Sequence, residues 1–368
     1  MRLSDEDLRL RTLARQLPDA GDVLDLFERL APIQSQVPRG PFVLASSRRP
    51  GTTYAEVNAL LESHALVKGT CLRGTVHTAS AAVWPDLDAV ARRARAGELR
   101  RALRLERLTP DDVTAEVERV CADRFVPREE LVDAVVGFVE AAEGRPVERS
   151  TFSDNLLWGH PGLVRRPRDE RWEKRTDAFH RTASTLLELG DSPSPDAALD
   201  RLVLRHVAAC GPVTRRDLAY FLGEQLRRVD ASLARLGDRL EHLDGPDPEG
   251  YLDLVDAPLT PSADLGVRLL SEFDALTVGY RGPGRTRFLR QEQLDVVWGR
   301  VNGQYAPTVL ADGRMVATWR VAGPARATRL EVAMLPGEAA LADDALEPPA
   351  RALGAVLDLQ VADVDVRA

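Results

Sequence analysis

The 368-residue chain has almost no lysine, little cysteine and no long apolar run. Lys68 and Lys174 are its two lysines, so 47 of the 49 basic residues are arginine. The chain has no G-x-x-x-x-G-K-[ST] loop, which argues against a nucleoside-triphosphate enzyme. Cys71, Cys121 and Cys210 lie far apart without a C-x-x-C pair. This excludes a disulfide framework and a cysteine-based zinc site.

The apolar runs are all shorter than the roughly 18 residues that a membrane-spanning helix requires. Residues 1–7 are acidic rather than apolar and do not resemble a signal peptide. We therefore expect a cytoplasmic protein without a membrane partner. The six histidines show neither i, i+4 pairs nor an H-x-E companion, so we expect no metal site and no other cofactor.

A net charge of −8 would normally argue against a nucleic-acid partner, but average charge conceals local patches. The arginines cluster in residues 92–107 and 145–175, and the segment after residue 338 is mostly acidic. Codon bias in a GC-rich genome explains the ratio of arginine to lysine. The clustering leaves room for a basic face on an acidic protein.

The clearest local pattern lies in residues 191–258. Helix-start signals occur at Ser194-Pro195 and in a capping box formed by Thr214 and Asp217. A third apolar stripe follows, and then two short β-like runs around a turn within residues 240–255. Three helices and a hairpin in this order are typical of a winged helix-turn-helix.

Two less regular copies of this pattern occur upstream. In the first, helices are expected at residues 23–30 and 54–64, followed by two strands within residues 65–78. In the second, the basic stretch 162–175 could form the wing. Its helix-start signals are Thr109-Pro110, Val126-Pro127 and Thr151.

The period changes to β-like after about residue 269, and Asn302-Gly303 and Asp312-Gly313 are strong hairpin-turn signals. The expected β runs are 275–280, 294–301, 304–310, 314–321 and 328–335. We therefore predict an α+β fold with winged helices at 1–95, 96–190 and 191–258 and a β-rich domain at 259–368.

The segment from Pro32 to Pro38 contains a Q-x-Q pattern, Gln34-Ser35-Gln36. The two prolines bias their preceding residues away from helix, and side chains two apart share a face in extended backbone. Two convergent amides offer donors and acceptors without charge, which suits positioning a water molecule or a sugar. Taken alone, the pattern is more typical of a polar loop.

Together with four other stretches, this segment resembles the AlkZ/YcaQ-like winged-helix DNA glycosylases, nearer the AlkZ side because the second position is Gln36. Ser35 departs from the family pattern, which usually has an aliphatic residue there. The resemblance covers about residues 5–335. Its other stretches are 73–77, 156–165, 270–274 and 309–320.

The resemblance implies a C-shaped protein whose concave basic surface holds duplex DNA, with Gln34 and Gln36 as its catalytic pair. It also implies a β-hairpin that approaches the minor groove. We expect the tip of that hairpin at Asn302-Gly303-Gln304-Tyr305.

Further DNA contacts are expected from basic side chains near the first two wings. Arg73 and His77 either line the DNA face or lie on the exposed side of a wing strand. Arg165, Arg166 and Arg168 are expected to contact phosphates, which increases affinity without reading sequence.

A purine alkylated at N7 or N3 already carries positive charge, so its glycosidic bond breaks without protonation of the base. A neutral amide pair then suffices, through positioning and electrostatics. Neither lysine lies in the Q-x-Q segment, so we expect a monofunctional glycosylase rather than a lyase. Its expected partner is double-stranded DNA with alkylated purines, including bulky adducts or interstrand crosslinks from a genotoxic natural product, bound by a monomer in the nucleoid. The alternative is a non-catalytic winged-helix transcriptional regulator.

Overall fold

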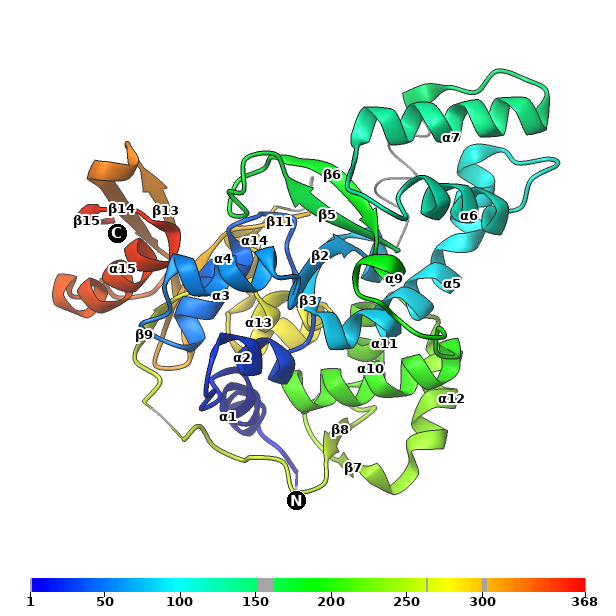
Figure 1. The fold of residues 1–368 in the computed structure, drawn as a ribbon. Coiled ribbons are helices and arrows are strands. Elements are labelled where there is room, and N and C mark those ends of the chain that lie inside the picture. Colours follow the sequence, from blue (N-terminus) through cyan, green and yellow to red (C-terminus); the bar gives the residue numbers. More distant parts are fainter. Residues whose placement is uncertain (1, 151–161, 263, 300–302, 368) are drawn as a thin grey trace. The chain divides into compact units, whose positions relative to one another are not determined.

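The computed structural model describes residues 2–150, 162–262, 264–299 and 303–367 (Figure 1). The chain forms two compact units. Unit 1 combines residues 1–60 with 203–368, and unit 2 contains residues 61–202. Among the described helices, none has both the length and the hydropathy to cross a bilayer. The helix-start signal at Thr151 lies outside the described residues.

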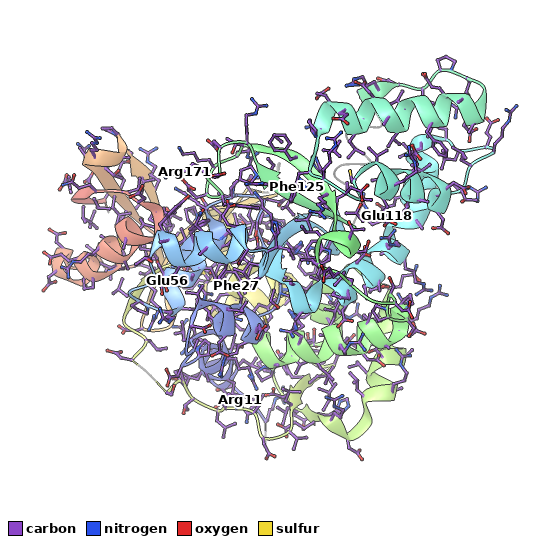
Figure 2. The ribbon with its side chains drawn as sticks, viewed as in Figure 1. Arg11, Phe27, Glu56, Glu118, Phe125 and Arg171 are labelled. Atoms are coloured by element: carbon purple, nitrogen blue, oxygen red, sulfur yellow. The ribbon has the colours of Figure 1, made fainter. Side chains whose placement is uncertain are left out.

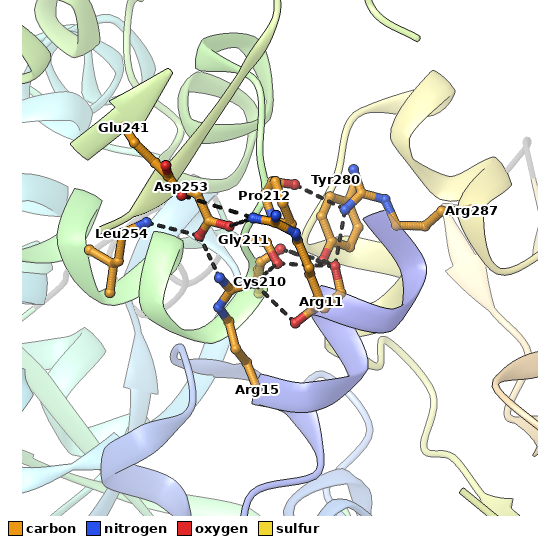
Figure 3. Close-up of polar contacts among 11 residues, drawn as sticks. Arg11, Arg15, Cys210, Gly211, Pro212, Glu241, Asp253, Leu254, Tyr280 and Arg287 are labelled. Atoms are coloured by element: carbon orange, nitrogen blue, oxygen red, sulfur yellow. Dashed lines mark hydrogen bonds and ion pairs between the residues drawn. The ribbon is translucent and has the colours of Figure 1, made fainter. Parts of the chain in front are cut away.

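Unit 1 begins with a helix held by buried arginines. Helix α1 (Asp5–Gln16) starts at a capping box between Ser4 and Asp7. The guanidinium groups of Arg11 and Arg15 reach the two carboxylate oxygens of Asp253, at 3.3 and 2.5 Å (Figure 3). The carboxylate side chain is fully buried, and the two arginines are nearly so. The following elements of this segment are α2 (Val23–Arg29), β1 (Ile33–Gln34), α3 (Gly40–Arg48) and α4 (Tyr54–Glu62).

The three helices and the hairpin predicted for residues 191–258 are present. Thr214 and Asp217 form the predicted capping box. The apolar face of this segment buries Leu199, Val203 and Leu218. The elements are α10 (Pro195–Cys210), α11 (Arg215–Leu222), α12 (Leu226–Leu236) and the antiparallel strands β7 (Leu240–Leu243) and β8 (Tyr251–Leu254).

The C-terminal part of unit 1 contains a five-stranded sheet in the order β15-β14-β13-β12-β9 (Figure 1). The predicted turn at Asp312-Gly313 joins β12 to β13, with φ of 47° and 80°, as a type I′ turn requires. The strands are β9 (Val267–Leu269), β12 (Thr308–Ala311), β13 (Arg314–Ala322), β14 (Thr328–Met334) and β15 (Val361–Arg367), and the separate pair β10 (Trp298–Gly299) and β11 (Gln304–Tyr305) is antiparallel.

One predicted strand is wrong, and a second is only partly a strand. Residues 275–280 instead contain the helix α13 (Ala275–Val278), because the Asp274 carboxylate accepts from the Leu276 amide and caps it. Of the expected run 294–301, residues 294–297 belong to α14 (Gln291–Val297), residues 298–299 form the strand β10, and residues 300–301 lie outside the described residues. Short apolar runs fit a strand or a buried helix equally well, so the cap decides.

The acidic C-terminal segment is also folded. Helix α15 (Asp343–Leu357) packs against α3 and β9, and β15 pairs in parallel with β14. Pro348 and Pro349 lie inside α15, in its second turn. The sequence prediction missed this helix because prolines usually end a helix beyond its first turn.

Unit 2 contains antiparallel strands in the order β3-β2-β5-β6-β4. Gly69 permits the β2–β5 contact, because a Cβ there would lie 2.4 Å from the Leu163 carbonyl oxygen and 2.6 Å from the Trp84 ring. The elements are β2 (Leu66–Thr70), β3 (Val76–Ser80), α5 (Trp84–Leu103), α6 (Pro110–Val120), β4 (Val126–Pro127), α7 (Arg128–Glu143), β5 (Leu163–Pro167), β6 (Asp177–Thr182) and α9 (Ala183–Leu186).

Candidate functional site

The amide side chains of Gln34 and Gln36 meet at the end of β1. The Nε2 group of Gln34 donates to Oε1 of Gln36 at 2.7 Å. The expectation that the two amides point together is therefore confirmed. Gln34 is 8% exposed, and Gln36 is half-buried and more accessible.

Local hydrogen bonds hold this segment in its non-helical shape. Helix α2 ends at Arg29, and the ψ of 160° at its C-cap residue Leu30 turns the backbone into an extended path. The Ser35 hydroxyl donates to the Ile33 carbonyl at 2.9 Å. The Gly40 amide donates to the Val37 carbonyl at 2.9 Å and begins α3. Ser35, between the two glutamines, thus holds the local backbone in place through its hydroxyl, whereas an aliphatic side chain would only pack.

Helix α3 provides a rigid support for the Q-x-Q segment. All of its residues from Gly40 to Arg48 are buried. The Arg48 guanidinium forms a two-pronged ion pair with Asp274, at 2.6 and 2.7 Å, and both side chains are almost fully buried. This geometry strengthens a buried arginine–carboxylate pair and fixes its orientation.

A second arginine anchors the start of α3. Arg39 donates through Nε and Nη2 to Oε1 of Glu272, at 3.2 and 2.5 Å. Its guanidinium also lies 5.0 Å from the centre of the Trp319 ring. We refer to Arg39, Glu272 and Trp319 as the Arg39 clamp. It holds the backbone three residues after Gln36.

Both acidic partners come from one short segment, 270–274. The residue between them, Phe273, has a φ of 55°, which is uncommon for a residue with a side chain. This turn places Glu272 toward Arg39 and Asp274 toward Arg48. Sequence reasoning noted the segment only for its family resemblance, because no local pattern predicts pairing across more than 220 residues.

The chemistry available at the glutamine pair is that of neutral amides. Each amide carries one acceptor oxygen and two N–H donors and does not change charge with pH. In the described parts of the chain, no group of three or more histidine, cysteine or acidic side chains could hold a metal ion. The pair can orient a water molecule and stabilise developing positive charge through its carbonyl dipoles.

His77 is wrong as a DNA contact and as an exposed wing residue. It is fully buried in β3, and its Nδ1 lies 2.9 Å from the Thr75 carbonyl oxygen. Burial, followed by the nearby Arg73 charge, lowers its pKa to about 3. Arg73 itself is half-buried in the turn between β2 and β3 and stays a prediction.

Arg165 is also wrong as an exposed phosphate contact. It is 3% exposed, donates to the Thr70 hydroxyl, and has its pKa lowered to about 10, mainly by burial. Arg166 is half-buried, and its guanidinium lies 3.5 Å from the Glu62 carboxylate. The guanidinium also lies 5.7 Å from the centre of the ring of Phe125, which is labelled in Figure 2. Arg168 is exposed in the β5–β6 loop. Arg166 and Arg168 stay candidates.

The predicted hairpin tip is only partly supported. Tyr305 is wrong as a tip residue: it is 6% exposed, stacked on Trp298 and in edge contact with Phe273. Gln304 is exposed at the end of the β10–β11 pairing. Asn302 lies outside the described residues, as do residues 156–161 of the family-like stretch 156–165.

Because unit 2 contains two buried histidines, we expect its folding stability to fall at acidic pH. The pKa values of His77 and His180 are both lowered to about 3, mainly by burial. Because the ordinary value is near 6.5, the unfolded chain takes up protons first, so stability is lost as pH falls from about 6.5 toward 3. Between pH 7.5 and 5.5 we expect a loss of about 1.4 kcal/mol per histidine in urea unfolding.

The control for this pH effect is the exposed His242. His180→Phe should reduce the loss between pH 7.5 and 5.5, and His242→Gln should leave it unchanged. Equal pH dependence in the native chain and His180→Phe would contradict the assignment.

Comparisons with known proteins identify the family of the chain. The family model described as DNA glycosylase AlkZ-like matches residues 27–356. A curated relative from Streptomyces sahachiroi, named interstrand DNA cross-link repair glycosylase, is 27% identical over 325 residues, covering 83% of each chain. The solved structure of Streptomyces sahachiroi DNA glycosylase AlkZ shares the fold, with a TM-score of 0.81, 21% identity and full coverage of both chains. Because the family model spans most of its length, the chain belongs to the AlkZ-like family of DNA glycosylases.

Proposed function

We propose that this glycosylase hydrolyses the N-glycosidic bond of N7- or N3-alkylated purines in duplex DNA, with Gln34 and Gln36 as its catalytic pair. The observation that carries the proposal is the 2.7 Å hydrogen bond that aligns the two amides. Such a pair lacks a titratable acid or base. It therefore suits a substrate whose leaving base is already cationic.

The reaction balances without an acid catalyst. The C1′–N9 bond breaks, and its electron pair neutralises the positive charge of the alkylated purine. A water molecule oriented by the amides attacks the oxocarbenium carbon and loses one proton to solvent. The amide dipoles lower the barrier by positioning and electrostatic stabilisation.

We further propose that the enzyme is monofunctional and leaves an abasic site. A lyase requires an accessible neutral amine for a Schiff base. Lys68 is buried with its ammonium 2.8 Å from the Asp177 carboxylate, and exposed Lys174 lies in the β5–β6 loop rather than in the Q-x-Q segment.

The substrates proposed are bulky adducts and interstrand crosslinks from a genotoxic natural product. The name of the curated relative supports the crosslinks. A host that makes such a compound would use the enzyme for self-protection. We propose a cytoplasmic, nucleoid-associated monomer. Arg73, Arg166, Arg168 and Gln304 are the proposed DNA contacts.

Base release from defined DNA tests this function. Purified protein is incubated with a duplex containing one N7-methylguanine, and abasic sites are converted to strand breaks with hot alkali. A second duplex carries a bulky N7 adduct. Breaks only after alkali support a monofunctional glycosylase, and breaks before alkali indicate a lyase. DNA binding without release from any alkylpurine would favour the regulator.

The Arg39 clamp should affect the chemical step. In Glu272→Gln the carboxylate charge that holds Arg39 is lost, so the backbone after Gln36 is less fixed. We expect single-turnover base release to fall about ten- to a hundredfold, because small displacements of catalytic groups are costly. Duplex affinity should stay unchanged.

Glu331→Gln is a matched control. Its carboxylate side chain is 11% exposed, as is that of Glu272, and each lies 2.5 Å from an arginine nitrogen. Base release equal in both variants would show that the clamp does not position the glutamines.

A further inference from the structure

Helix α5 of unit 2 has one face of arginines that pair with no carboxylate among the residues that the structure describes. Arg93, Arg100 and the C-cap residue Arg104 lie within about 40° of one another on the helix circumference. Arg101 flanks them, with its guanidinium nitrogen 3.7 Å from where a Cβ at Gly97 would stand. All four arginines are exposed. We call them the α5 arginine face.

The acidic residues of α5 are all paired with other arginines. Asp86 lies 2.5 Å from Arg201, and Glu98 lies 2.7 Å from Arg95. Asp88 lies 2.9 Å from Arg92, which also contacts Glu118, labelled in Figure 2. Within the described parts of the chain, no ion pair neutralises the α5 arginine face.

Two carboxylates near the C-terminal end of α5 are also engaged. Glu143 accepts from the backbone amides of Glu106, Arg107 and Leu108, and these bonds lower its pKa. Glu140 accepts from the Val147 amide at 3.0 Å. Arg145 adds another cation at this end, and it donates to the Arg104 carbonyl at 2.6 Å.

The helix dipole accounts for only part of this arrangement. Cations in the last turn are favourable because the C-terminal end of a helix carries partial negative charge. That effect reaches Arg100, Arg101 and Arg104. It does not reach Arg93, which lies about 16 Å from Arg104 along the helix axis. Like charges at i, i+4, such as Arg100 and Arg104, repel each other. An external anion would remove this repulsion.

We propose that the α5 arginine face binds the phosphodiester backbone of duplex DNA. The inference rests on the proposed function, in which duplex DNA is the substrate. The α5 arginine face is about 16 Å long, from Arg93 to Arg104. This length matches four to five phosphates along one DNA strand, at about 3.4 Å of axial rise each. Arginine binds such a row through charge and paired N–H donors. The contact is independent of sequence.

The test is the salt dependence of binding to an undamaged 20-base-pair duplex. The variant Arg93→Gln/Arg100→Gln/Arg101→Gln keeps residues of good helix propensity and leaves the left-handed Arg104 unchanged. Each lost phosphate contact should reduce the slope of log K against log salt by about 0.9. We expect a slope reduced by two to three units and affinity lowered about a hundred- to a thousandfold at about 0.1 M salt.

The control is Arg239→Gln/Arg326→Gln/Arg351→Gln, which changes net charge equally at other exposed arginines. It should bind DNA with nearly the native slope, and circular dichroism should show native helix content in both variants. Native slope and affinity in the α5 variant, or an equal loss in the control, would overturn the proposal.

The two proposals can fail separately. If the native protein binds undamaged duplex but releases no alkylated base, the proposed function is refuted. The DNA affinities of the α5 variant and its control can still be compared in that case. If the native protein releases alkylated bases and the α5 variant binds duplex DNA with native slope and affinity, only the proposed contact between the α5 arginine face and DNA is refuted.

Discussion

A chain carrying both Gln34→Ala and Gln36→Ala should bind alkylated duplex DNA normally but release the base at least about a hundredfold more slowly. The reason is that the two amides are the groups proposed to orient water and stabilise the sugar cation. Their hydrogen bond makes them a unit, so each single variant should lose more than half of the combined effect in free energy. Single-turnover assays and fluorescence anisotropy measure the two quantities.

The matched control replaces two exposed glutamines, Gln291→Ala and Gln360→Ala, with the same chemical change away from β1. Ser35→Ala separates the backbone role of the intervening hydroxyl from the role of the amides. Full base release by the double Gln34/Gln36 variant would refute the catalytic assignment, whatever its DNA affinity.

The second large effect is on stability. Asp253→Asn should lower the free energy of unfolding by about 3–5 kcal/mol, because it leaves Arg11 and Arg15 buried without a counter-charge. The nearest other carboxylate, Glu241, lies 3.9 Å from Arg11 and is 40% exposed. Urea unfolding followed by far-UV circular dichroism measures the change.

Asp238→Asn, at an exposed carboxylate of the same unit, should change stability by less than about 0.5 kcal/mol. Combining Asp253→Asn with Arg15→Met should recover part of the loss, since one unpaired cation is removed. Equal urea midpoints for Asp253→Asn and the native chain would show that the network in Figure 3 contributes little.

Local signals predicted the helices and hairpins well where caps and turns are strong. The box at Thr214 and the turn at Asp312-Gly313 are examples, because the residues that satisfy the backbone lie within the same few positions. The signals failed for α13 and α15. There, the deciding factors were an aspartate cap on a short apolar run and burial against α3, which overrides the unfavourable prolines.

The site was predicted in the same uneven way. The flanking prolines and the spacing of Gln34 and Gln36 were enough to predict that the two amides converge, because the geometry involved is local. Arg165, His77 and Tyr305 were assigned to a surface that they do not reach, because a basic or aromatic residue in a short strand gives no sign of which face is covered. The Glu272 partner of Arg39 depends on tertiary folding alone.

The packing of α15 on α3 has a consequence for biosynthesis. Helix α3, which supports the glutamine segment, ends at Arg48, whereas helix α15, which covers α3, ends only at Leu357. A ribosome must therefore translate past Leu357 before the amide pair has its full support. Nascent chains that stop short of α15 should be inert toward DNA bases.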